Sequence, residues 1–437
     1  MSLSTEQSQA DRIKQLSREH VFTSWSAQGA LDQLPLAGGE GAHFWDHDGN
    51  RYLDLTSQLV NVNIGYQHPK LVAAIQEAAA QLTTIAPSFD SESRAEAARL
   101  IAERAPEGMS KVFFTNSGAE AVENAIRLAR LHTGRHKLLA AYRSYHGATH
   151  GAITLTGEGR RLGSEPGIPG VVHFWGPYLY RSAFHATTEQ EECDRALEHL
   201  RQTISFEGPG QIAAIILESV VGSNGILVPP AGYLEGVRAL CDEHGILLIA
   251  DEVMAGFART GQWFAIQNWG VRPDLITFAK GVNSGYIPLG GVILSDEIAA
   301  TFDERPYPGG LTYSGHALAC ASAVASITIM EEEGILPHVR EVGEQVLRPG
   351  LTGLTRHEAV GDVRGLGVFW AVELVADRQS RQPLGAEAMG QVAAACKAEG
   401  VWPLINGNRV HVVPPCVITQ DEARRAVEVL DGALGSL

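Results

Sequence analysis

Two residues of opposite charge follow short apolar runs in the middle of the chain. Asp251 comes directly after the apolar residues 246–250, and Lys280 ends the mainly apolar run 275–279. A continuous apolar run of this length is typical of a strand buried on both faces, as in a parallel sheet between helices. Because open α/β sheets build their sites at the carboxyl ends of such strands, we expect a carboxylate and an amine in one crevice.

Two further motifs follow predicted strands. Ser117, Gly118 and Ala119 stand between a strand and a helix, where the free N–H groups at the helix start could bind an anion. Taken alone, a serine in this position is more often an ordinary N-cap. Tyr145 and His146 follow another strand, and the tyrosine ring could stack on a planar ligand or pack over the sheet edge.

In combination, these residues match the needs of pyridoxal phosphate. A helix start would hold its phosphate, an aromatic face would cover its ring, and Lys280 would form a Schiff base with its aldehyde. Asp251 would keep the pyridine nitrogen protonated, so that the ring can accept the electrons of a substrate carbanion. The sequence has no GxGxxG run, no GxxxxGK[ST] loop and no HExxH pair, and its 16 His residues do not cluster at metal-ligand spacing, so we expect no metal site.

The elements that must position these residues alternate between strands and helices from about residue 90. Repeated βα units of this kind predict an α/β fold with a mostly parallel sheet between helices. Strands are predicted at 111–115, 137–141, 211–217, 246–250 and 288–294, and helices at 119–132, 233–244 and 317–333.

The chain ends differ in character from this central part. A β-hairpin is predicted on either side of the turn 48–50, and the region after about residue 335 alternates helices with short strands. We therefore expect a large domain and a smaller α+β domain. The predicted segments are 1–69 (N-terminal part of the small domain and an arm), 70–334 (large cofactor-binding domain) and 335–437 (C-terminal part of the small domain). Helices are predicted in the last segment at 336–347, 386–400 and 420–434.

Composition limits the possible partners and the compartment. The 437 residues carry a formal net charge of −16, which argues against general binding to nucleic acids or to anionic membrane surfaces. No apolar run is long enough to span a bilayer, and residues 1–20 lack the apolar core of a signal peptide. The five cysteines are scattered without CxxC spacing, which favours reduced thiols in a cytoplasmic protein.

Over nearly its whole length the chain resembles the class III (ω) aminotransferases, which belong to the fold type I pyridoxal-phosphate enzymes. The motifs that carry the resemblance are Thr-Asn-Ser-Gly-Ala-Glu-Ala (115–121), Tyr-His-Gly (145–147), Ala-Asp-Glu-Val (250–253), Phe-Ala-Lys-Gly (278–281), Thr-Tyr-Ser-Gly-His (312–316) and Val-Arg-Gly-Leu-Gly (363–367). The resemblance implies a seven-stranded type of large-domain sheet, a small domain built from both chain ends, and a homodimer or tetramer with shared active sites.

The resemblance also implies roles for the residues around the cofactor ring. Lys280 would be the Schiff-base lysine and the proton carrier, and Asp251 would pair with the pyridinium nitrogen. Val253 and Tyr145 would pack against opposite faces of the ring, and Glu218 would lie near its 3-hydroxyl side.

The phosphate group would have ligands from two subunits. Ser117, Gly118 and Ala119 would hold it from one chain, and Thr312 would reach it from the other. His146, within the Tyr-His-Gly motif, is expected among the cofactor-binding residues.

The substrate is predicted from a narrower similarity. Residues 24–29 and 57–65 look most like those of taurine–pyruvate aminotransferases and related pyruvate-dependent enzymes, which implies ping-pong amino transfer from an amine or ω-amino acid, such as a taurine-like donor, to pyruvate. A decarboxylase, an aminomutase or a silent pyridoxal-phosphate-binding protein remains an alternative, because the cofactor motifs are shared. Pocket walls are expected from Trp25, Leu59, Val60, Phe89, Tyr178 and Leu404.

Two of these positions depart from the family pattern. Val60 stands where many pyruvate-dependent members have an aromatic residue, and Leu404 stands where they have a mobile arginine for the substrate carboxylate. Arg409 is close in sequence but is expected to lie out of register. The group that binds the carboxylate is therefore open: another arginine takes this role, or the substrate differs.

Overall fold

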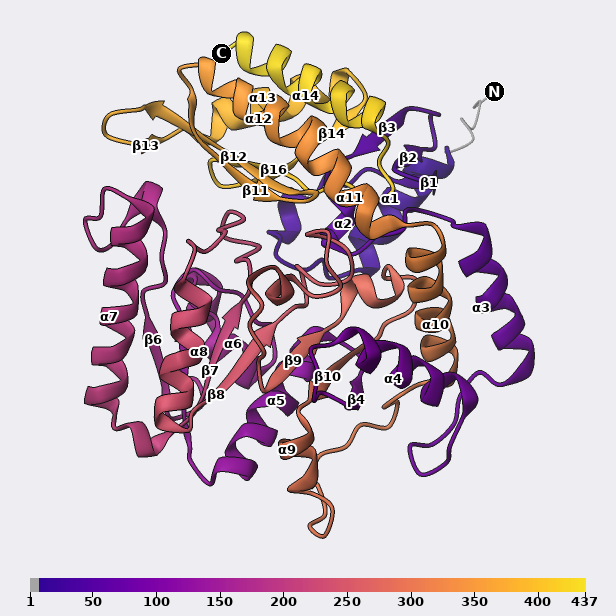
Figure 1. Ribbon diagram of the computed structural model, residues 1–437. Helices are drawn as coiled ribbons and strands as arrows, with labels where there is room; N and C mark the ends of the chain where they lie inside the picture. The colour runs from indigo at the N-terminus through magenta and orange to yellow at the C-terminus, as the bar shows by residue number, and fades with distance from the viewer. Residues whose placement is uncertain (1–7) are drawn as a thin grey trace.

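Seven strands form the central sheet of the computed structural model, which describes residues 8–437 (Figure 1). Their order is β4-β10-β9-β8-β7-β5-β6, and only β10, among these seven, runs against the others. This sheet confirms the predicted α/β class. In chain order the strands are β4 (Lys111–Thr115), β5 (Lys137–Ala141), β6 (Val171–Phe174), β7 (Ile212–Glu218), β8 (Leu247–Asp251), β9 (Leu275–Phe278) and β10 (Gly290–Leu294).

Alternate residues along the central strands pack against two different helix layers. On β8, Leu247 and Ile249 belong to the apolar cluster of α5 (Gly118–Thr133), whereas Leu248 and Ala250 belong to the cluster of the opposite face. This burial on both faces is the physical reason for the continuous apolar runs. The helices that contribute to the second cluster include α3 (Pro69–Gln81), α4 (Glu92–Arg104), α7 (Glu189–Glu207), α8 (Tyr233–His244) and α10 (Ala317–Glu332).

The two ends of the chain meet in a four-stranded sheet. Its order is β1-β2-β3-β14, and β14 pairs in parallel with β3 so that Val401 lies opposite Leu53. The predicted hairpin is present as β2 and β3, and the carboxylate of Asp46 accepts two main-chain N–H groups of the turn. The strands are β1 (Leu36–Glu40), β2 (His43–Asp46), β3 (Arg51–Asp54) and β14 (Val401–Trp402).

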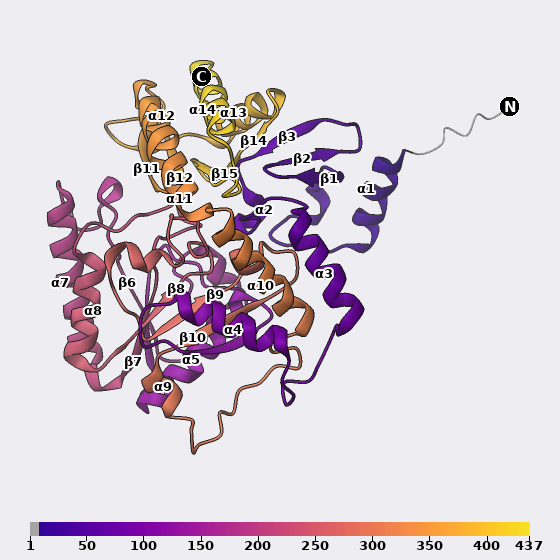
Figure 2. The same cartoon turned by 45° about the vertical axis from the view of Figure 1, so that its right-hand side comes forward.

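A third sheet lies in the C-terminal region, beside the helices that end the chain (Figure 2). Its strands are antiparallel, in the order β11-β12-β16-β15, with β13 beside β12. The expected helix 336–347 instead continues to residue 353, through a π-helical turn over Gly343–Leu347. The elements are β11 (Val360–Leu366), β12 (Phe369–Asp377), β13 (Gln382–Pro383), β15 (Leu404–Asn406), β16 (Arg409–Val412), α11 (Ile335–Val342), α12 (Arg348–Gly353), α13 (Ala386–Ala398) and α14 (Gln420–Gly435).

Short helices complete the description. They are α1 (Gln9–His20), α2 (Ser57–Val60), α6 (His150–Leu155) and α9 (Asp296–Ala300). Within residues 8–437, none of the helices combines the length and apolar character that a membrane crossing needs. The predicted domain boundaries at residues 69 and 334 stay a prediction.

Candidate active site

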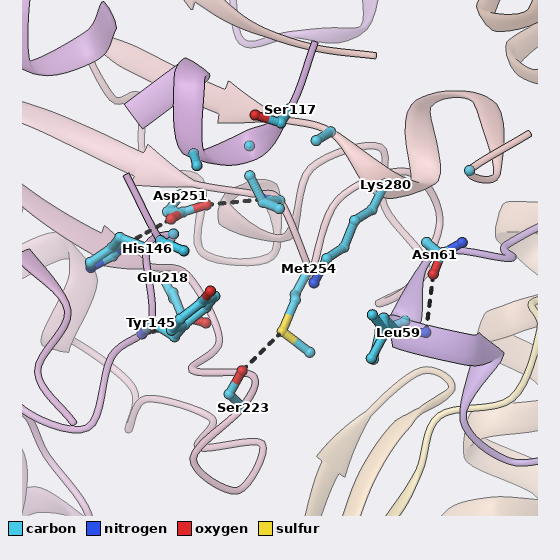
Figure 3. Close-up of a pocket in the computed structure, with 18 of the residues that line it drawn as sticks. Leu59, Asn61, Ser117, Tyr145, His146, Glu218, Ser223, Asp251, Met254 and Lys280 are labelled. Carbon is cyan, nitrogen blue, oxygen red and sulfur yellow. Dashed lines mark hydrogen bonds and ion pairs between the residues drawn. The ribbon is translucent and has the colours of Figure 1, made fainter. Parts of the chain in front are cut away.

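A cavity of about 920 Å³ opens at the carboxyl ends of the central strands (Figure 3). Glu218 ends β7 and Asp251 ends β8, and the two residues are paired across these neighbouring strands. Lys280 extends into the cavity opposite the group formed by these carboxylates and Tyr145. The structure therefore places the amine of Lys280 and the carboxylate of Asp251 in one cavity, as expected.

Lys280 does not end a strand, in contrast to the sequence interpretation. Strand β9 stops at Phe278, and Lys280 begins a short 3₁₀ turn with a φ of 44°, in the left-handed region that non-glycine residues rarely adopt. Burial lowers the pKa of the Lys280 amine to about 8, although the nearby carboxylates of Glu218 and Asp251 act in the opposite direction. The backbone turn thus presents a lysine that is partly neutral near pH 7.

Asp251 is held by two donors. Its Oδ2 atom lies 2.7 Å from Nδ1 of His146, and its Oδ1 atom accepts the main-chain N–H of Val253 at 3.1 Å. The His146 side chain is fully buried, and its main-chain N–H donates to Thr156. Since no Lys or Arg side chain contacts this carboxylate in the described part of the chain, Asp251 is available to a cationic or N–H group of a ligand.

Glu218 is held by main-chain donors. Its Oε1 accepts the N–H of Tyr145 at 2.9 Å, and its Oε2 accepts the N–H of Gly222 at 2.8 Å. Burial raises the pKa of this carboxyl to about 7. Glu218 can therefore exchange a proton, or share a hydrogen bond with a hydroxyl group, near neutral pH.

The start of α5 forms one wall of the cavity. Ser117 is its N-cap, as the common interpretation of such a serine predicts, and its Oγ accepts the N–H of Glu120. Ser117, Gly118 and Ala119 all line the cavity, where first-turn N–H groups have no acceptor within the helix. A Cβ atom at Gly118 would lie 2.9 Å from both methyl carbons of Val253, so the close approach of these walls requires glycine. This wall has the features of an anion site.

Arg160 is a cavity-lining residue that the sequence interpretation missed. Its guanidinium carbon lies 3.8 Å from the ring centroid of Tyr145, and Glu158 accepts its Nε–H. The residue belongs to a short 3₁₀ helix (Gly159–Ser164) with no helical or strand periodicity, so the sequence gives little sign of its position. Asn61 and Met254 also line the cavity and were not predicted.

Most of the predicted site residues converge on this cavity. Those that line it are Trp25, Leu59, Val60, Ser117, Gly118, Ala119, Tyr145, His146, Glu218, Asp251, Val253, Lys280 and Leu404.

Three predicted positions lie elsewhere. The Phe89 side chain is 63% exposed and Thr312 is also exposed, and neither lines the cavity. Tyr178 was expected in the pocket wall, but it is buried outside the cavity, where its hydroxyl group donates to Glu373. Its hydrogen bond to a buried, arginine-paired carboxylate is what draws it away.

The residues around the cavity fit pyridoxal phosphate. The helix start suits the phosphate, Asp251 suits a protonated pyridine nitrogen, and the Lys280 amine suits an aldehyde. Tyr145 and Val253 both line the cavity, so a flat ring there can pack against an aromatic and an aliphatic side chain. Among residues 8–437, no three His, Cys, Asp or Glu side chains converge in a way that could hold a metal ion.

Comparisons with known proteins agree with this geometry. The sequence profile described as aminotransferase class III matches residues 27–434. The chain is 34% identical to a putrescine–pyruvate aminotransferase of Pseudomonas aeruginosa, covering 92% of this chain and 91% of that protein. It is 33% identical to a taurine–pyruvate aminotransferase of Rhodobacter capsulatus, covering 93% and 92%.

Solved structures give the same result. The chain superposes with a TM-score of 0.95 on a taurine:2-oxoglutarate aminotransferase from Bifidobacterium kashiwanohense determined with pyridoxal phosphate and glutamate, at 40% identity over 99% of this chain and 98% of that one. It also superposes with a TM-score of 0.94 on an (S)-enantioselective ω-transaminase from Thermomicrobium roseum, at 36% identity over 99% of each chain.

Proposed function

This chain belongs to the class III aminotransferase family and is a pyridoxal-phosphate-dependent transaminase, and we propose that it moves the amino group of an amine or ω-amino acid to pyruvate. The observation that carries the proposal is the presence of Asp251, Lys280 and the start of α5 around one cavity. No one of the three groups would suffice, because each has an ordinary structural role elsewhere in proteins.

Each wall of the cavity takes a part in holding the cofactor. Ser117, Gly118 and Ala119 would bind its phosphate, Asp251 would bind its ring nitrogen, and Lys280 would hold it covalently. When bound, pyridoxal phosphate supplies an electron sink for the bonds of the substrate carbon that carries nitrogen. His146 supports this arrangement by holding Asp251.

Lys280 has the role of a proton carrier. With a pKa of about 8, roughly a tenth of the amine is neutral at pH 7, far more than for an exposed lysine. A neutral amine inside the cavity can take a proton from the substrate carbon and return it to another atom. Glu218, with a pKa of about 7, lies close enough to affect the charge of this amine.

The donor class follows from the walls and from the relatives. The cavity combines apolar side chains such as Leu59, Val60 and Leu404 with charged groups around Lys280, which suits a small amine. Two proteins of similar sequence are named for putrescine and taurine as donors and pyruvate as acceptor. One structural relative is named for 2-oxoglutarate, so the test must include both acceptors.

We also propose that the working unit is a homodimer. Trp25 and Leu59 line the cavity but are 64% and 56% exposed, and Phe89 and Thr312 lie on the surface outside it. A second copy of the chain would cover these side chains and bring Thr312 to the phosphate of the neighbouring site. The five cysteines are buried and unpaired, which supports a reducing, cytoplasmic location.

A panel of donors against two acceptors tests the proposed function. Purified enzyme with pyridoxal phosphate is given taurine, β-alanine, 4-aminobutyrate, putrescine or 1-phenylethylamine together with pyruvate or 2-oxoglutarate, and alanine or glutamate is measured. Turnover with at least one donor and pyruvate is expected, and Lys280→Ala should abolish it. Turnover that releases CO₂, or that needs no keto acid, would instead identify a decarboxylase or an aminomutase. Full turnover by Lys280→Ala would contradict the assignment of the site.

A further inference from the structure

The proposed reaction brings a carboxylate into the cavity whatever the donor is. A keto acid carries this group next to its reacting carbonyl, and the group has to be stripped of water as the acid binds. A carboxylate buried without a charged donor binds poorly, whereas a guanidinium can bind it through two parallel hydrogen bonds. At position 404 the cavity wall is leucine, which offers no such donor.

The other basic side chains near the cavity are already in use or neutral. Lys280 faces the carboxylates of Glu218 and Asp251, and His146 is bound to Asp251. Burial lowers the pKa of His411 to about 3, so this imidazole carries no charge at neutral pH.

Arg409 is also directed elsewhere. Its Nη1 atom donates to the main-chain oxygen of Asn224 at 2.6 Å and its Nε donates to that of Asn406 at 3.2 Å. Arg409 is not among the described residues that line the cavity. Among the described lining residues, Arg160 is the one arginine.

We propose that Arg160 binds the acid group of the substrates, a carboxylate or sulfonate, and thereby sets the specificity of the site. This inference rests on the proposed function. The guanidinium carbon of Arg160 lies over the ring of Tyr145, 3.8 Å from the ring centroid. Such a cation–π contact holds the guanidinium over the ring, while its N–H groups can still bind a ligand.

The contacts of Arg160 leave part of its donor set available. Glu158 accepts the Nε–H, and in the part of the chain that the structure describes the two terminal nitrogens have no recorded protein acceptor. The side chain is 34% exposed, so a ligand in the cavity can reach it. Arg160 and Lys280 line the same cavity, and Arg160 is near enough to lower the pKa of the Lys280 amine.

One guanidinium therefore serves both halves of the reaction. It would bind the acid end of a β- or ω-amino acid or of an aminosulfonate in the first half, and the carboxylate of the keto acid in the second. Amines without an acid group would not use it. Turnover of the wild-type enzyme with an amine that lacks an acid group consequently reports amino transfer independently of acid binding.

The test uses the holoenzyme and its Arg160→Gln and Arg160→Lys variants. Propionate and ethanesulfonate carry the acid groups of β-alanine and taurine without the amine, and their dissociation constants are measured by calorimetry. We expect Arg160→Gln to weaken both by about 10- to 100-fold, and Arg160→Lys to weaken them less. Both variants should still bind pyridoxal phosphate, measured by its absorbance, so that a loss of acid binding is distinguished from damage to the cofactor site.

Arg161 offers a matched control, because it is the next residue, pairs with Glu165 and does not line the cavity. Arg161→Gln removes the same charge from the same helix and should leave acid binding unchanged. Unchanged binding in Arg160→Gln, or equal weakening by Arg161→Gln, would overturn the proposal. Loss of bound cofactor in Arg160→Gln would also overturn it, because Arg160 would then be a cofactor ligand. The same holds if Arg409→Gln, and not Arg160→Gln, weakens the binding of propionate and ethanesulfonate.

Failure of the proposed function has a different signature. In that case wild-type holoenzyme transfers no amino group from any donor, including 1-phenylethylamine. If only the Arg160 proposal is wrong, the wild-type enzyme still transfers amino groups. In that case Arg160→Gln binds propionate and ethanesulfonate as tightly as wild type does.

Discussion

The Nδ1 atom of His146 lies 2.7 Å from the Oδ2 atom of Asp251, and both side chains are almost completely buried. Asp251 ends a central strand, and His146 follows the end of another, so the fold of the sheet itself brings them together. The imidazole fixes the orientation of the carboxylate within the cavity wall. We infer that His146 is a positioning residue that acts through Asp251.

Replacing His146 by leucine should therefore impair amino transfer without unfolding the protein. The variant leaves Asp251 with the N–H of Val253 as its remaining recorded donor, and loss of one hydrogen bond to a charged group corresponds to a decrease in kcat/KM of about 10- to 100-fold. Steady-state kinetics across pH 6–9 measure the effect. His150→Leu, at an exposed histidine of the same region, is the control and should behave like wild type. Wild-type kinetics in His146→Leu would contradict the inferred role.

The amine of Lys280 should react as an unusually acidic lysine in the cofactor-free protein. Because its pKa is lowered to about 8, the neutral and reactive fraction rises through pH 8 as the pH increases, well below the value of 10.5 for an ordinary lysine. Competitive acylation followed by peptide mass spectrometry measures this pH dependence. Lys70 is an internal control, since hydrogen bonds to Glu332 and Glu333 raise its pKa. Half-maximal labelling of Lys280 near pH 10 would show that burial does not lower its pKa.

The neighbouring residue Glu252 should affect the pH dependence of stability. Its oxygens accept the N–H groups of Ala265 and Ile266 outside the cavity, and burial raises its pKa from 4.5 to about 7. The folded state therefore keeps a proton that the unfolded chain releases, and this contribution to stability is lost as the pH rises from about 4.5 through 7. Thermal melts should show a flatter pH dependence in Glu252→Gln than in wild type. Glu243→Gln, at an exposed carboxylate, should keep the wild-type slope.

The proposed dimer predicts complementation between two defective variants. Lys280→Ala removes the reacting amine of its own site, and Thr312→Ala removes the proposed phosphate ligand of the partner's site. A mixed dimer of the two has one site with neither defect. Mixing and reassembly should thus raise the activity above that of either variant alone, in assays at low cofactor concentration. If Thr312 acted within its own chain, every site in the mixture would carry one defect and no gain would appear.

Position 404 should accept an alternative acid-binding group. Leu404 lines the cavity on β15, so Leu404→Arg places a guanidinium at another point of the same wall. In the Arg160→Gln background, this change should recover part of the lost affinity for propionate, by about tenfold. Calorimetry measures the recovery, and Leu404→Met serves as a size-matched control without charge. No recovery with arginine would indicate that the acid group does not reach this wall.

Much of the cofactor site could be predicted from the sequence because it depends on strand ends. Asp251 and Glu218 end fully buried strands whose apolar runs are visible in the sequence, and a parallel sheet brings such ends together. Lys280 was placed at a strand end, yet it lies two residues beyond β9, because the backbone turns into a left-handed conformation there.

The remaining residues could not be predicted because loops place them. Arg160 has neither periodicity nor a strand before it, and its position follows from stacking on Tyr145, which only the folded chain shows. Tyr178 was expected in the pocket, but its hydrogen bond to Glu373 holds it elsewhere. Phe89 and Thr312 lie outside the cavity of a single chain, so a role for them in the site requires the proposed second copy.

The parallel pairing of Leu53 with Val401 also determines the order in which parts of the molecule can mature during synthesis. The hairpin of β2 and β3 leaves the ribosome early, but the strand that covers its open edge emerges only near the end of translation. The central sheet has no such delay, since its seven strands come from one continuous stretch, residues 111–294. The central sheet of the nascent chain can therefore fold before β14 has been synthesised and can pair with the edge of β3.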